Sequence, residues 1–112
     1  MASKQSIVDY LCEQITQAGN IRYRKMFGEY AIYCDEKVVA LVCDDQLFIK
    51  PTTAGRELIE VLEEAPPYPG AKMYYLISSD LWEDREFMTK LITATASELP
   101  LPKAKKKKVS SK

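Results

Sequence analysis

Residues 21–50 place the strongest constraint on the fold, because their apolar side chains follow a period of two. Short runs rich in Tyr, Ile, Val and Phe are interrupted at three places: Gly28, Asp35-Glu36 and Asp44-Asp45. Alternating apolar residues between short polar breaks are typical of β-hairpins. The pattern predicts a meander of three or four antiparallel strands.

The segments on either side of the meander have helical periodicity instead. Residues 4–18 carry an apolar stripe at spacings of three and four, which predicts a first helix: Ile7, Leu11, Ile15 and Ala18. A second helix is expected over about 54–64, after a cap at 51–53. Its inner face is expected to be formed by Leu58, Ile59, Val61 and Leu62.

The last third of the chain predicts a loop, a strand and a helix. The stretch APPYPGAK holds three prolines and a glycine, so it cannot form regular structure, and KMYYLIS after it alternates like a strand. Asp80 and Glu83 resemble a capping box that starts a third helix. The apolar side of this helix is expected to be Trp82, Phe87, Met88, Leu91, Ile92 and Thr95.

The expected order is therefore α-β-β-β(-β)-α-β-α, an α+β fold in two layers. We expect an antiparallel sheet of four to five strands with the helices mainly on one face. At 112 residues the chain has the size of one domain, expected over 1–99, followed by a disordered lysine-rich tail over 100–112.

The formal net charge of zero hides an asymmetry between the domain and the tail. The tail from Lys103 onward carries six lysines and no acid, so the other 102 residues have ten cations against sixteen acids and a charge of −6. Three roles for the tail stand side by side: solubility, docking or targeting, and contact with polyanions. The lysines expected to contact a polyanion such as DNA or RNA are Lys103, Lys105, Lys106, Lys107 and Lys108.

Neither a metal site nor catalysis by histidine is expected, because the chain contains no histidine and its three cysteines are far apart. A two-residue turn at 35–36 places Ile32 opposite Val39 and Tyr30 opposite Leu41. Cys34 and Cys43 then share a face, but they lie roughly 20 Å apart at ~3.3 Å per strand residue. We expect free thiols, no catalytic residue and no cofactor. The core side of the sheet is expected to be Tyr30, Ile32, Val39, Leu41 and Phe48.

The sequence KMFGEYAIYCDEKVVALVCDDQLFIK resembles the signature of the TfoX N-terminal domain family. The matching elements are the MFG and DD motifs: Met26, Phe27, Gly28, Asp44 and Asp45. Glu36 departs from the family, which often has a turn glycine there, so this turn is expected to need a geometry other than type I′. Larger members carry a further helical domain that these 112 residues do not include.

The resemblance implies a non-enzymatic accessory role in transcription regulation. Full-length members regulate natural competence and help the cyclic-AMP receptor protein to act at particular promoters. By this resemblance the partner is a transcription regulator. The sequence has no apolar run of the ~18 residues that a membrane span needs and no secretory signal, so we expect a cytoplasmic protein without a membrane partner. The alternatives are a small-ligand-binding protein or minor enzyme with a Tyr/Lys/Arg pocket, and a weak nucleic-acid binder that acts through its tail.

A second group of cations lies in the meander, three of them at its start and Lys50 at its end. The residues that could contact a partner or a nucleic acid are Arg22, Tyr23, Arg24, Lys25 and Lys50. Basic and aromatic residues in alternation can hold phosphates and stack on bases. The same alternation also fits a strand with one solvated face, so both interpretations stand at this point.

Overall fold

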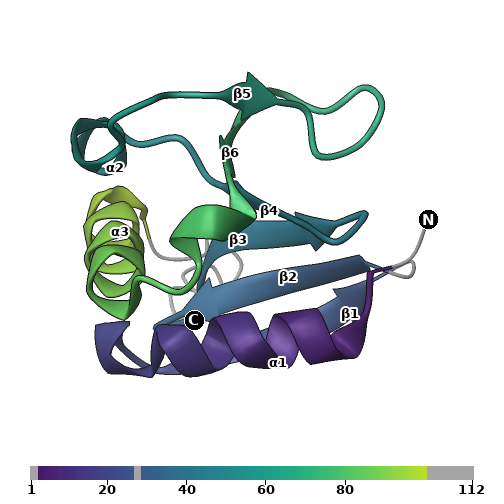
Figure 1. The fold of residues 1–112 in the computed structure, drawn as a ribbon, viewed down its shortest axis with the longest axis horizontal. Coiled ribbons are helices and arrows are strands. Elements are labelled where there is room, and N and C mark those ends of the chain that lie inside the picture. The colour runs from purple at the N-terminus through teal and green to yellow at the C-terminus, as the bar shows by residue number, and fades with distance from the viewer. Residues whose placement is uncertain (1–2, 27–28, 101–112) are drawn as a thin grey trace, which may run out of the picture.

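The computed structural model describes residues 3–26 and 29–100, and it contains one six-stranded antiparallel sheet (Figure 1). The strands lie in the order β1-β2-β3-β4-β6-β5. Their bounds are β1 Ile21–Met26, β2 Glu29–Cys34, β3 Lys37–Cys43, β4 Gln46–Ile49, β5 Glu64–Ala65 and β6 Tyr74–Ile77. The α+β class and the antiparallel meander are confirmed, with one more strand than expected.

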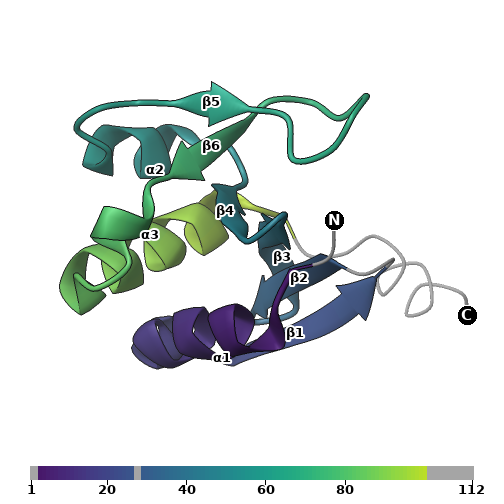
Figure 2. The same ribbon diagram turned by 45° about the vertical axis from the view of Figure 1, so that its right-hand side comes forward.

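The helices gather mainly on one face of this sheet, as Figures 1 and 2 show. Their bounds are α1 Gln5–Gln14, α2 Thr53–Leu58 and α3 Arg85–Glu98, with 3-10 turns η1 Thr16–Ala18 and η2 Ser79–Leu81. Both α1 and α3 pack on the sheet, and α2 packs on α3. Gly55 of α2 makes this approach close, since a Cβ there would lie 3.1 Å from the Thr95 hydroxyl oxygen.

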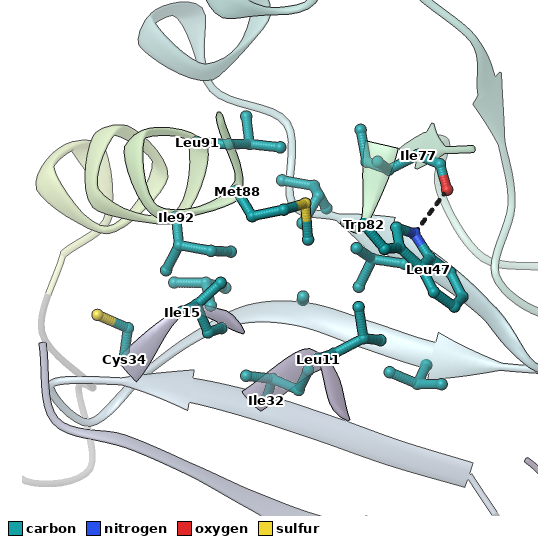
Figure 3. Packing of buried hydrophobic residues seen from close by; sticks show 14 of the residues in the cluster. Leu11, Ile15, Ile32, Cys34, Leu47, Ile77, Trp82, Met88, Leu91 and Ile92 are labelled. Atoms are coloured by element: carbon teal, nitrogen blue, oxygen red, sulfur yellow. Dashed lines mark hydrogen bonds between the residues drawn. The ribbon is translucent and has the colours of Figure 1, made fainter. Parts of the chain in front are cut away.

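The hydrophobic core lies between the sheet and the helices α1 and α3 (Figure 3). We call α1 together with η1, residues 5–18, the first helical segment. Its Leu11 and Ile15 meet Met88, Leu91 and Ile92 of α3 over the strand residues. The indole of Trp82 closes one end of the core, and its Nε1 donates a hydrogen bond to the carbonyl of Ile77 at 3.2 Å. The predicted apolar sides of the first and third helices are therefore largely correct.

The segment after α2 differs from the prediction. The helix ends at Leu58, and the Val61 side chain, expected in the core, is 80% exposed. Residues 63–65 instead pair with β6: Leu76 N–H donates to the Glu63 carbonyl at 2.9 Å, and Glu64 lies opposite Tyr75. This pairing satisfies backbone groups of β6 that a longer α2 would have left at an open edge.

The start of α3 also lies later than predicted. Its N-cap is Asp84, whose carboxylate accepts from the Phe87 N–H at 3.1 Å, and Asp80 lies in the turn η2. Asp80 and Asp84 are both acids that could cap a helix three residues further on, so this local spacing does not distinguish the two start sites. Trp82 lies between η2 and α3 and is buried, and α3 begins after it.

The pairing of β2 with β3 follows the predicted register only beside the turn. Cys34 pairs with Lys37 and Tyr33 with Val38, but a bulge then places Ile32 opposite Ala40 and Tyr30 opposite Val42. The bulge shifts the face of every residue beyond it.

Two predictions about β3 are therefore wrong. Leu41 is half-buried and pairs with Phe48 on the face opposite the helices, although it was expected in the core. Cys43, two residues further along β3, likewise does not share a face with Cys34, which belongs to the core cluster. Phe48 is buried, but it lies outside that cluster.

Candidate interaction surface

Both hairpin turns adopt the left-handed geometry that usually calls for glycine or asparagine. The backbone φ angles are 52° and 71° at Asp35 and Glu36, and 54° and 59° at Asp44 and Asp45. Positive φ at both central residues is the type I′ signature, which matches the twist of the flanking strands. The expectation that Glu36 demands another turn geometry is therefore wrong.

Two of these turn aspartates hold the ends of the first helical segment. Asp45 Oδ1 accepts from the Lys4 N–H at 2.8 Å, and Asp35 Oδ1 accepts from the Asn20 N–H at 2.9 Å. Ser3 joins the first contact, because its hydroxyl donates to Glu29 at 2.6 Å and accepts from the Asp45 N–H at 3.0 Å. The DD motif is thus a structural element of the domain.

The strand β1 forms one edge of the sheet. It pairs only with β2, so within residues 3–26 and 29–100 the backbone groups on its other side have no strand partner. The side chains of Arg22, Arg24 and Lys25 are exposed along this strand. We call β1 with these three cations the basic edge.

Arg22 is the most restrained cation of the basic edge. Its guanidinium donates to the Glu36 carboxylate at 2.8 Å and lies 4.9 Å from the centre of the Tyr33 ring. The hydrogen bond to Glu36 raises the pKa of the Arg22 guanidinium. Arg22 therefore helps to hold the hairpin turn that contains Glu36.

The side chains of Arg24 and Lys25 make no hydrogen bond or ion pair with other residues of the described part of the chain. They point to opposite faces of β1, because successive strand residues alternate. Tyr23, which lies between Arg22 and Arg24, is a packing residue: its ring meets Tyr30 edge-on at 5.5 Å, and its hydroxyl accepts from Gln5 Nε2 at 3.0 Å. Desolvation raises the pKa of Tyr23.

Lys50 does not join this cluster. It follows β4, three strands from β1, and the usual strand spacing puts that at roughly 14 Å. The structure therefore brings Arg22, Arg24 and Lys25 together and leaves Lys50 apart. A single Tyr/Lys/Arg pocket that combines Arg24 with Lys50 has no support in this arrangement.

The other predicted residues divide between packing and parts outside the description. Met26 is 40% exposed at the end of β1, and the remaining MFG residues, Phe27 and Gly28, lie outside the described residues. The lysine tail also lies outside them. Within the described part, no group of three or more potential ligands could hold a metal ion, and no helix is long and apolar enough to cross a membrane.

The three cysteines are free thiols in the structure. Burial raises the pKa of Cys12 to about 11 and that of Cys43 to about 11, and it raises the pKa of Cys34 as well. The Cys34 Sγ lies 3.7 Å from the Ala18 carbonyl, which it faces as a weak donor. These thiols are protonated at neutral pH and are poor nucleophiles and metal ligands.

A comparison with protein families matches residues 13–99 to the TfoX N-terminal domain. The chain belongs to the TfoX N-terminal domain family. A protein of Spirochaeta aurantia, described as an uncharacterized 12.7 kDa protein in the trpE 5′ region, is 41% identical over 111 residues. The match covers 99% of this chain and 96% of that protein. This TfoX N-terminal domain protein and its relative are therefore similar over nearly the whole of both chains.

Proposed function

We propose that this TfoX N-terminal domain is a non-enzymatic regulatory adaptor that acts by protein contact through its basic edge. The observation that carries this proposal is the edge strand β1, where two cations, Arg24 and Lys25, stand beside backbone groups that have no strand partner within residues 3–26 and 29–100. An open edge strand is a template for an added strand from a partner.

The charges favour an acidic extended segment as the added strand. Backbone hydrogen bonds supply affinity in strand addition, and side chains along the strand supply the choice of partner. A second copy of β1 would bring cations against cations, which opposes self-pairing. Arg22 contributes less, since Glu36 already binds its guanidinium.

Family membership supports a transcription regulator as the source of that segment. Full-length members act together with the cyclic-AMP receptor protein at competence promoters, so we place this domain in the cytoplasm beside the transcription machinery. The role needs no cofactor.

The proposal is tested by complementing a deletion strain of the native host. We expect the deletion to change a set of transcripts, and wild-type protein to restore them. The variant R24E/K25E should fail to restore them. The control R56E/K72E, which makes the same change of charge at two other exposed cations, should succeed.

Circular dichroism would first establish that both variants are folded. The proposal fails if the deletion changes no transcript, or if R24E/K25E restores them as well as the control does.

A further inference from the structure

A groove of about 590 Å³ is lined by residues of the α2–β5 connection, β6 and the η2–α3 segment, at the end of the sheet away from β1. Figure 1 shows these elements together on one side of the molecule. Its walls contain three of the large apolar side chains that the fold leaves exposed. Leu58 and Leu81 are each 38% exposed, and Val61 is 80% exposed. The other apolar lining residues are Ile59, Leu76, Ile77 and Phe87.

The same groove has carboxylates and no cation among its described lining residues. The acidic residues are Glu60, Glu63, Asp80 and Asp84. Asp84 is engaged as the N-cap of α3, but Glu60, Glu63 and the Asp80 side chain form no ion pair within the described residues. An apolar groove with an acidic rim fits an extended segment that carries several lysines and an apolar residue.

We propose that this groove binds a lysine-rich segment, and that its occupant in this chain is residues 106–109 of the chain's own C-terminal part. This segment, KKKV, supplies three lysines for the carboxylates and Val109 for the apolar wall. The charges are complementary: the groove acids belong to residues 1–102, which carry a net charge of −6, and the lysines belong to residues 103–112, which carry +6.

Chain length allows this contact. From Glu98 at the end of α3 back to Arg85 at its start is roughly 20 Å at ~1.5 Å per residue. Six residues beyond Pro100 reach about 20 Å when extended, so Lys106 and the three residues after it can cover that distance. A tethered segment also has a local concentration in the millimolar range, which favours it over the tail of a second copy.

Binding in the groove withholds these lysines from other polyanions. Occupation of the groove and contact with DNA or RNA therefore compete for one set of charges. The tail then becomes available to nucleic acid when something else fills the groove.

The first test uses the full chain and a carbodiimide, which joins amines to carboxylates only in direct contact. We expect intramolecular products that join Asp80 to the lysines of 106–108, in a yield independent of protein concentration. The groove variant E60Q/E63Q should lower the Asp80 product about 3-fold, because two of the charges that hold the segment are gone.

The control variant is E57Q/E64Q. It removes two exposed carboxylates from the same part of the chain, but neither residue lines the groove. It should leave the Asp80 product unchanged. An Asp80 product that persists in E60Q/E63Q, or that falls equally in the control, would overturn the proposal.

The second test measures the affinity of both full-length variants for a duplex DNA at low salt. The two variants have the same net charge, so any difference comes from where the carboxylates stand. E60Q/E63Q should bind about 3- to 10-fold more tightly than E57Q/E64Q, because its lysines are released from the groove. Equal affinities would refute competition between the groove and the nucleic acid.

Discussion

The second hairpin turn allows one energetic argument to be tested with two adjacent substitutions, Asp44→Gly and Asp45→Gly. The backbone of both residues lies in the left-handed region, with φ angles of 54° and 59°. An L-residue in this conformation costs roughly 1–2 kcal/mol, and glycine avoids that cost. Glycine also has more freedom in the unfolded chain, which takes back roughly 0.5–1 kcal/mol. Asp44→Gly should therefore stabilise the domain by about 0.5–1 kcal/mol.

Asp45→Gly gains the same relief but loses a hydrogen bond. The Asp45 carboxylate accepts from the Lys4 N–H at 2.8 Å, next to the first residue of α1. Loss of such a helix-start contact costs ~0.5–2 kcal/mol, typically ~1. The net effect of Asp45→Gly should be a small destabilisation, and the two variants should differ by about 1 kcal/mol. Asp45→Asn, which keeps an oxygen acceptor and tolerates the left-handed region, should lie close to the wild type.

Urea unfolding followed by the fluorescence of Trp82 measures these differences. Trp82 is the one tryptophan of the chain and is buried, so its emission reports the loss of the core. In a thermal melt a difference of 1 kcal/mol corresponds to roughly 4–8 °C for a domain of this size. Equal stability of Asp44→Gly and Asp45→Gly would show that the bond to Lys4 contributes nothing, and the reasoning would fail.

Three further predictions concern the core, the thiols and the tail. Ile32→Ala should destabilise the domain by about 2–5 kcal/mol because Ile32 is fully buried. Arg24→Ala, at an exposed position, should cost under ~0.5 kcal/mol, and thermal melts in the reverse order would contradict the assigned strand faces. The cysteines should react slowly with a thiol reagent in the native protein and quickly in denaturant. Because their folded pKa is raised to about 11 for Cys12 and Cys43, stability should fall as pH rises from the unfolded pKa near ~8.5 toward 11, and a rise in stability over that range would refute the burial argument. Binding to duplex DNA should weaken with salt at a slope of roughly −4 to −5 in log K against log salt and be lost in a chain ending at Pro102; binding that survives truncation, or that distinguishes two unrelated duplexes, would place nucleic-acid contact in the folded domain.

Local pattern was enough to predict most of the fold. Apolar residues in 21–50 mostly follow a period of two between polar breaks, and the stripes of the first and third helices recur at three and four, so the meander and the two core helices follow from periodicity alone. The resemblance to the TfoX N-terminal domain rests on the same stretch, and family membership is confirmed over residues 13–99.

The errors arose where distant backbone groups decide the structure. Residues 59–64 have helical spacing, but pairing of Glu63 and Glu64 with β6 prevails. No local signal marks the bulge in β2–β3, which moves Leu41 to the other face. For the candidate surface, the sequence supplied the cations of β1. It could not show that β1 is an edge strand, or that Asp35 and Asp45 bind the ends of the first helical segment.

The two edges of the sheet are unequal, and this limits the stoichiometry of any complex made by strand addition. At one side β5 consists of only Glu64 and Ala65, too short to template a further strand of ordinary length. At the other side β1 offers six residues. Within residues 3–26 and 29–100 the sheet thus has one edge of ordinary strand length, so the strand addition proposed above would join one partner strand to each domain. Growth into a filament would need a second edge of similar length, which the described part of the sheet does not offer.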